Sequence, residues 1–156
     1  MKNLYWIQSC ILLAGSIFAW FTVYTDFARF YNLYQSFTRI ENCIVPNPIT
    51  TPCFYGAFAF LGAFIWSLFI AKKTLIDKLK HQKRLFILLI GSTIFAWTNL
   101  AIEMYQFYLK EVGDKISCSG VETENIFTTP CFIGSMIFFL ALIVAYVIKK
   151  DRIKIS

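Results

Sequence analysis

Four of the five cysteines in this 156-residue chain form two pairs that occupy corresponding places in its two halves. The first pair is Cys43 and Cys53, and the second is Cys118 and Cys131. Cys53 and Cys131 each follow a proline, in two copies of the segment Thr-Thr-Pro-Cys-Phe. Because proline favours the first position of a helix, each thiol is expected beside the helix N-terminal amides that stabilise a thiolate. The pattern therefore allows two chemistries, namely structural disulfides or thiol–disulfide exchange.

We predict two structural disulfides, Cys43–Cys53 and Cys118–Cys131. Each pair lies within one loop, on the side of the membrane that is expected to be oxidising. Nine and twelve residues separate the paired cysteines, a spacing that suits a loop staple better than a reactive dithiol. The fifth cysteine, Cys10, has no counterpart in the other half and is predicted to be a buried, inert thiol.

Two acidic residues fall at equivalent places inside apolar segments. Gly15, Ala19, Thr22 and Asp26 share one helical face, and Ser92, Ala96, Asn99 and Glu103 repeat the same spacing. An ionisable residue that faces the interior of a membrane bundle is a functional-site candidate. Asp26, Glu103, Thr22 and Asn99 are therefore predicted to bind a small solute such as a cation. The alternative is that both acids are solvated among lipid headgroups, or that Asp26 pairs with Arg29.

The sequence predicts neither a metal site nor a haem. Its only histidine, His81, lies in a basic segment far along the chain from every paired cysteine, and we expect it to be solvated. No cofactor is expected under the solute-binding hypothesis.

The positioning elements follow from an internal duplication with an offset of about 77 positions. Gly-Ser-Ile-Phe-Ala-Trp at 15–20 returns as Gly-Ser-Thr-Ile-Phe-Ala-Trp at 91–97. Thr-Thr-Pro-Cys-Phe-Tyr-Gly at 50–56 returns as Thr-Thr-Pro-Cys-Phe-Ile-Gly at 128–134. A function carried by one half is therefore expected of the other half too.

The composition indicates an integral membrane protein. Hydrophobic residues make up 58% of the chain, and its mean hydropathy is +0.60. Four apolar runs are each about the 20 residues that a transmembrane helix needs: 4–24, 52–71, 85–105 and 130–148. Helices are expected because every backbone polar group in the bilayer must be satisfied within its own segment. Thr51 and Thr129 are placed to cap the second and fourth helices.

The charge distribution predicts the orientation. Eleven of the fifteen basic residues lie at the two termini or in segment 72–84. The positive-inside rule therefore places both termini and the 72–84 loop in the cytoplasm, with the cysteine loops outside. A bacterial-type inner or plasma membrane fits this pattern. The basic segment is short and lacks interleaved aromatic residues, so contact with the lipid bilayer is favoured over nucleic acid.

The predicted fold class is an all-α integral membrane protein of four transmembrane helices. Two tandem hairpin repeats, about 5–72 and 84–149, share one orientation because each contains an even number of helices. The helical pattern continues past the first and third apolar runs, so those helices are expected to project beyond the bilayer. Transport through so small a bundle would require a homodimer or a larger membrane complex.

Three functions compete at this stage. The leading prediction is non-enzymatic: binding or passage of a small solute between the repeats near the outer leaflet. The second is a thiol–disulfide oxidoreductase using Cys53 and Cys131 with Cys43 and Cys118, and with a quinone as electron acceptor. Four membrane helices with a cysteine pair in each outer loop resemble, in outline, the bacterial quinone-linked disulfide-forming membrane proteins, although this chain has no Cys-x-x-Cys. The third is an accessory subunit of a larger membrane complex.

Overall fold

The computed structural model describes residues 2–37, 45–109 and 125–153. Its elements are α1 (Lys2–Tyr34), η1 (Pro48–Thr50), α2 (Pro52–Lys72), α3 (Leu75–Leu109), η2 (Ile126–Thr128) and α4 (Pro130–Ile153), where η denotes a short 3₁₀ helix. The four α-helices are each long and apolar enough to cross a membrane. The prediction of an all-helical protein with four candidate membrane spans is therefore confirmed.

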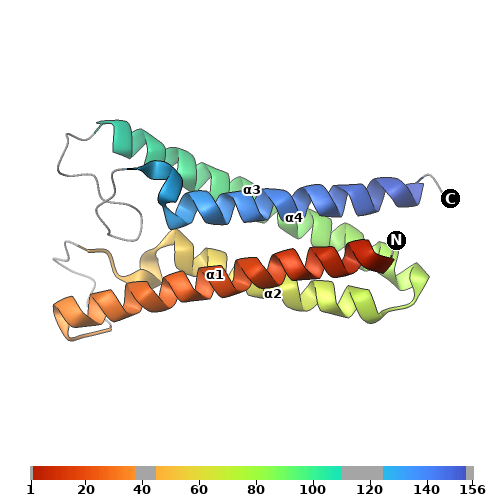
Figure 1. The fold of residues 1–156 in the computed structure, drawn as a ribbon, viewed down its shortest axis with the longest axis horizontal. Coiled ribbons are helices and arrows are strands. Elements are labelled where there is room, and N and C mark those ends of the chain that lie inside the picture. The colour runs from red at the N-terminus through yellow and green to blue at the C-terminus, as the bar shows by residue number, and fades with distance from the viewer. Residues whose placement is uncertain (1, 38–44, 110–124, 154–156) are drawn as a thin grey trace.

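The four helices form an elongated bundle (Figure 1). The main packing partners are α1 with α2, α3 with α4, α1 with α4, and α2 with α3, so the helices follow one another around the bundle in chain order. Both chain ends lie at the end of the bundle that also holds the short α2–α3 connection. The 3₁₀ helices η1 and η2 lie at the opposite end (Figure 1).

Helix lengths define two levels along the bundle. The 21 residues of α2 rise about 31 Å, which matches a hydrocarbon core of about 30 Å. The 33 residues of α1 rise about 50 Å, so α1 exceeds that thickness. If α2 spans the core, its first residues mark one membrane boundary and Lys72 marks the other. Below, the η1 and η2 end is called the outer end and the α2–α3 connection the inner end, following the predicted orientation.

The basic segment 72–84 is mostly helical, whereas the sequence analysis treated it as a loop. After a break at Lys73 and Thr74, α3 begins at Leu75 and continues through Arg84. The Thr74 hydroxyl donates to Oδ2 of Asp77 at 3.2 Å, and an acidic residue in the first turn suits the helix dipole. The part of the segment from residue 75 to 84 contains no proline or glycine to interrupt the helix.

The starts of α2 and α4 share one local design. Asn47 Oδ1 accepts a hydrogen bond from the Ile49 amide at 3.0 Å, and Asn125 Oδ1 accepts one from the Phe127 amide at 3.0 Å. Thr51 was expected to cap α2 with its side chain, and this was wrong: its hydroxyl donates backwards to the Pro48 carbonyl at 2.7 Å. The 3₁₀ turn thus uses the threonine hydroxyl that the helix was expected to use.

Small and aromatic residues make up the middle of the bundle. Four alanines on α2 and α4 are fully buried: Ala57, Ala63, Ala141 and Ala145. The rings of Phe60 on α2 and Phe138 on α4 stack with centroids 3.6 Å apart, and Gly15 on α1 lies against Phe60. Many large apolar side chains are exposed on the outside of the bundle, which is consistent with contact with a lipid bilayer.

Candidate functional site

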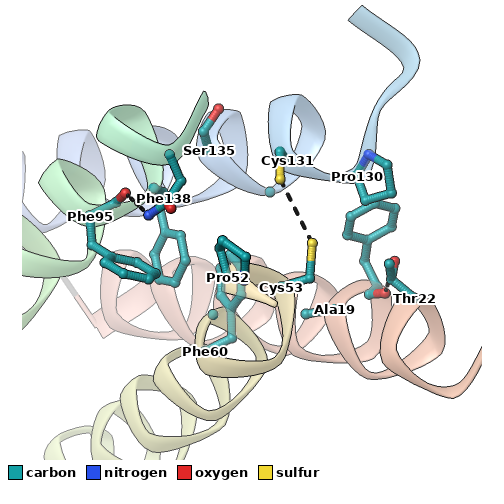
Figure 2. A pocket seen from close by; sticks show the side chains of 15 residues that line it. Ala19, Thr22, Pro52, Cys53, Phe60, Phe95, Pro130, Cys131, Ser135 and Phe138 are labelled. Atoms are coloured by element: carbon teal, nitrogen blue, oxygen red, sulfur yellow. Dashed lines mark hydrogen bonds between the residues drawn. The ribbon is translucent and has the colours of Figure 1, made fainter. Parts of the chain in front are cut away.

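A small cavity lies near the outer end, where α2 and α4 begin (Figure 2). Its volume is about 60 Å³. Most of its wall is apolar, and all four α-helices contribute to it. The residues that matter below are Thr22, Cys53, Phe60, Asn99, Cys131 and Phe138. Residues from both halves of the chain therefore meet in one site.

The closest approach of reactive groups in this site is between the two repeats. Sγ of Cys53 on α2 lies 3.8 Å from Sγ of Cys131 on α4 (Figure 2), a contact distance and not a covalent bond. Each cysteine is the second residue of its helix, directly after Pro52 or Pro130. Cys131 takes part in a disulfide, and its partner is not Cys53. The predicted partners, Cys43 and Cys118, lie outside the described residues, so the pairings Cys43–Cys53 and Cys118–Cys131 stay predictions.

Cys10 occupies a different environment from the one expected. The sequence analysis predicted a buried thiol, but Cys10 is exposed and carries a free thiol on α1. Exposure on an apolar helix of this length places it toward lipid. The error arose because the inward stripe of α1 runs through Leu12, Gly15 and Ala19, and Cys10 lies off that stripe.

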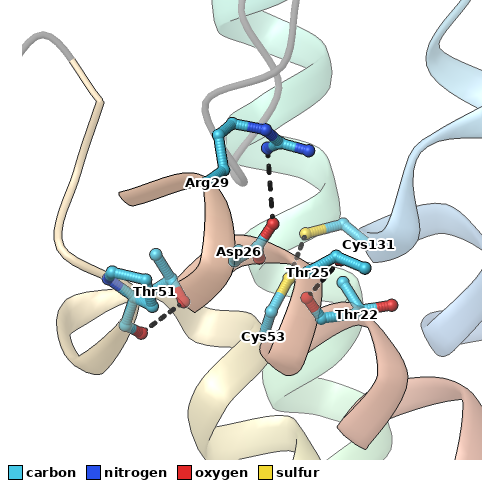
Figure 3. A network of polar contacts seen from close by, with 8 residues as sticks. Thr22, Thr25, Asp26, Arg29, Thr51, Cys53 and Cys131 are labelled. Atoms are coloured by element: carbon cyan, nitrogen blue, oxygen red, sulfur yellow. Dashed lines mark hydrogen bonds and ion pairs between the residues drawn. The ribbon is translucent and has the colours of Figure 1, made fainter. Parts of the chain in front are cut away.

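The two acids are buried at the same end of the bundle. Asp26 is 5% exposed and Glu103 is 7% exposed. Arg29 Nη1 lies 3.5 Å from Asp26 Oδ1, one turn along α1, as the alternative interpretation had it. Asp26 Oδ2 is buried and makes no hydrogen bond to the described residues. Both acids lie near enough to Cys53 to act electrostatically on its sulfur, and Figure 3 shows Asp26 beside the two cysteines.

Thr22 and Asn99 line the cavity but direct hydrogen-bond donors back onto their own helices. The Thr22 hydroxyl donates to the Phe18 carbonyl at 3.0 Å, and Asn99 Nδ2 donates to the Phe95 carbonyl at 2.8 Å. Both bonds follow the pattern by which a polar side chain satisfies itself inside a membrane helix. The cavity that these residues share with the cysteines is consequently less polar than a solute site built from them was expected to be.

On sequence alone the cysteine set and the acid set were bases for alternative functions, whereas the structure gathers both at one end of the bundle. The approach of Cys53 to Cys131 was not predicted. The repeat could have predicted this approach, because equivalent residues at the starts of equivalent helices lie at one level and meet if both face the axis between the repeats. The disulfides predicted within each loop pointed to other partners for both cysteines.

No cluster of three or more histidine, cysteine or acidic side chains suited to a metal ion occurs among residues 2–37, 45–109 and 125–153. His81 lies at the inner end, far from the cysteines along α2 and α3. It is only partly exposed, and its Nε2 lies 2.9 Å from Lys73 Nζ. The expectation that His81 is solvated stays a prediction, and the structure adds a contact with Lys73.

No known protein-family model, curated protein or solved structure significantly matches this chain. The geometry of the outer site is therefore the basis for a functional proposal.

Proposed function

We propose that this protein is a membrane thiol–disulfide oxidoreductase in which Cys53 and Cys131 form a reversible disulfide between the two repeats. The observation that carries the proposal is the 3.8 Å separation of their sulfurs. A disulfide bond is about 2.05 Å long, so a shift of about 2 Å would close it. A pair of purely structural cysteines, each stapled inside its own loop, has no need to bring its sulfurs into contact across the bundle.

The reaction balances as two exchange steps. A dithiol substrate on the outer side attacks the Cys53–Cys131 bond as a thiolate, which forms a mixed disulfide and releases the other cysteine. The second substrate thiol then displaces the first cysteine, so the substrate leaves as a disulfide and has lost two electrons and two protons. Cys53 and Cys131 remain as thiols.

A quinone of the bilayer is the proposed electron acceptor. It takes two electrons and two protons from the two thiols, leaves as the hydroquinone, and the Cys53–Cys131 bond re-forms. The site lies at the end of α2, at one boundary of the hydrocarbon, where a lipid-soluble oxidant and a water-borne substrate can both arrive. A cavity of about 60 Å³ holds only a few water-sized molecules, so a quinone ring enters only if side chains at the wall move.

The buried acids supply the proton transfers in this proposal. A carboxylate near a thiol can accept its proton when the thiol becomes a nucleophile and return it when the thiolate leaves. Asp26 has a buried oxygen that makes no hydrogen bond to the described residues, and it acts on Cys53 together with Glu103. In this proposal, Asp26 and Glu103 are buried beside the sulfurs because they exchange protons with the thiols.

The test is quinone reduction by the purified protein in detergent, with dithiothreitol as the dithiol and a short-chain benzoquinone as acceptor. Loss of quinone absorbance should require both sulfurs, so Cys53→Ser and Cys131→Ser should each reduce the rate to the uncatalysed background. Cys10→Ser is the matched control, since Cys10 is a thiol on the same bundle outside the site, and it should keep the full rate.

Peptide mapping under non-reducing conditions provides the opposing outcome. A stable pair of bonds Cys43–Cys53 and Cys118–Cys131, unaffected by dithiothreitol at a concentration that reduces small disulfides, would reject the redox proposal. The cysteines would then be loop staples, and breaking one pair would cost about 2–4 kcal/mol of stability.

A second candidate function has one observation in its favour. Asp26 has a buried oxygen that makes no hydrogen bond to the described residues and lies near a second buried acid, which is also what a cation site offers. Binding of tetraphenylphosphonium, measured by equilibrium dialysis, should then disappear in the Asp26→Asn, Glu103→Gln double variant while Cys53→Ser binds normally. The accessory-subunit hypothesis has no structural observation that favours it over these two.

The orientation is part of the proposal, because the substrate must meet the cysteines on the outer side. We infer from the basic residues that the inner end is cytoplasmic. Lys80→Cys, on the exposed face of α3, should resist a membrane-impermeant maleimide in intact cells and react once the cells are permeabilised. Labelling in intact cells would contradict the inferred orientation, and the cysteines would then not face the oxidising compartment that the reaction needs.

A further inference from the structure

A second, larger cavity lies at the inner end of the bundle, between α2 and the beginning of α3. Its volume is about 350 Å³. Four of its six lining residues come from α2 at helical spacing, one directly follows α2, and one comes from α3: Gly62, Ile65, Trp66 and Phe69, then Lys73, then His81. It is a groove on one face of α2 with an apolar floor and a basic end.

The basic end has a defined geometry. Lys73 Nζ lies 2.9 Å from His81 Nε2. An ammonium group only donates hydrogen bonds, so Nε2 of His81 is the acceptor in this contact. Lysine carries three N–H donors, and this contact uses one of them. Within the part of the chain that the structure describes, the other two donors are not used, and they can bind an anion at the end of the groove.

The groove has the length of a lipid acyl chain in one leaflet. Lys73 directly follows α2, so if α2 spans the hydrocarbon core, Lys73 lies at its inner boundary. Gly62 lies 11 residues earlier, which is about 16 Å along the helix and close to half of the 30 Å core. A Cβ added to Gly62 would meet nothing within 4 Å, so the groove is open at its deep end.

We propose that this groove binds one anionic phospholipid of the inner leaflet. Lys73 contacts the phosphate, held in place by His81, and one acyl chain runs over Trp66 and Ile65 to Gly62. This site is independent of the proposed thiol chemistry, because it lies at the other end of α2 from Cys53.

Charge decides between this occupant and a second copy of the chain. Segment 72–84 carries six basic residues and a single acid, Asp77. Two copies that meet at this groove would bring two such segments together, and like charges at an interface oppose association. An anionic headgroup instead gains about 1 kcal/mol for each nearby basic residue.

The test is native mass spectrometry of the full chain in detergent with phosphatidylglycerol or phosphatidylcholine of identical acyl chains. The wild-type chain should retain one phosphatidylglycerol in preference to phosphatidylcholine. Lys73→Gln should weaken phosphatidylglycerol binding about fivefold, the factor that corresponds to one cationic contact, and leave phosphatidylcholine unchanged. Lys73→Arg, which keeps the charge, should restore the preference.

Two further variants make the result specific. Lys150→Gln removes an exposed charge on α4 outside the groove and is the matched control, which should bind like wild type. Gly62→Phe fills the deep end and should weaken both lipids alike.

Equal binding of the two lipids, or equal loss in Lys73→Gln and Lys150→Gln, would overturn the proposal. A dimer that persists in detergent and disappears in Gly62→Phe would replace it with an interface between two copies. The lipid variants leave Cys53 and Cys131 intact, so failure here does not affect the redox test.

Discussion

The outer and inner ends of this bundle both bury polar groups, but of different kinds. At the inner end Gln82 Nε2 donates to Gln8 Oε1 at 3.1 Å, between helices that face each other across the bundle, and the Ser67 hydroxyl donates to that of Ser9 at 2.9 Å. These groups are neutral at any ordinary pH, and each pair joins two helices. Such contacts fix the relative heights of membrane helices.

The outer end buries groups whose chemistry allows a change of protonation or bonding state, namely carboxyl and sulfur groups. Asp26 is nearly as buried as Gln82, at 5% against 4% exposure, and each keeps one buried oxygen, Oδ2 or Oε1, without a hydrogen bond to the described residues. Only the Asp26 carboxyl, however, can gain or lose a proton in the ordinary pH range. Cys53 and Cys131 lie in contact without a bond between them. A bundle that only needed to hold together would gain more from neutral pairs at both ends. Under the proposed function, the inner end holds the fold and the outer end performs the chemistry.

The aromatic stack between these regions separates them. Phe60 and Phe138 line the outer cavity on the side that faces the inner end. Gly15 touches Phe60, and Gln8 lies about two helical turns further toward the inner end than Gly15. Changes at one end should therefore leave the other end intact, and variants can test this.

The largest expected effect is on catalysis at the outer end. The Asp26→Asn, Glu103→Gln double variant should lower the rate of quinone reduction about 100-fold, the lower range for loss of general acid–base catalysis, while the protein stays folded. Asp77→Asn is the matched control, since it removes an exposed acid at the inner end and should not change the rate. An unaltered rate in the double variant would show that the buried acids take no part in proton transfer, and would favour their role in binding a cation.

The next effect is on the stability of the aromatic stack. Gly15→Ala would place a Cβ 2.5 Å from Phe60 Cε1 and 2.9 Å from Ile137 Cγ2. Phe60 cannot retreat because its ring stacks on Phe138 at 3.6 Å. The overpacking should cost about 1–3 kcal/mol, measured by unfolding in sodium dodecyl sulfate with tryptophan fluorescence.

The repeat supplies the matched control for this variant. Gly91 is the sequence equivalent of Gly15, but a Cβ added there meets nothing within 4 Å. Gly91→Ala should therefore be neutral, or stabilise α3 by about 0.5–1 kcal/mol through helix propensity. Equal destabilisation by the two variants would mean that the stack yields to the added methyl group, and it would not then be the rigid boundary described above.

How much of this was predictable differs between the two ends. Composition and run length were sufficient for four apolar helices, because hydrocarbon imposes the same demand on every spanning segment. The proline at the start of α2 and α4 placed Cys53 and Cys131 at helix N-termini correctly. The burial of Asp26 followed from the small residues that share its face, Gly15 and Ala19.

What the sequence did not predict depends on contacts between helices. The Gln8–Gln82 pair joins positions that are not repeat equivalents, so neither periodicity nor duplication points to it. The Lys73–His81 contact required the α2–α3 connection to be short, and the sequence analysis had assumed a longer loop. Which helices face each other is a property of the whole bundle, whereas patterns along one segment report only which of its faces is turned inward.

The smallest expected effect belongs to the Gln8–Gln82 contact and tests the structural role of the inner end directly. Gln8→Leu and Gln82→Leu should each destabilise the bundle, because the remaining amide is left buried without this partner. The double variant should be less destabilised than the sum of the two, with an interaction energy of about 0.6 kcal/mol and at most about 1.7 kcal/mol. The effects of Gln8→Leu and of Ser135→Ala, at the outer cavity, on the free energy of unfolding should be additive because those sites are far apart.

Quinone reduction should remain at the wild-type rate in all of these variants. A loss of that rate without a loss of stability would mean that the inner polar layer belongs to the reaction, and the division of roles between the two ends would have to be abandoned.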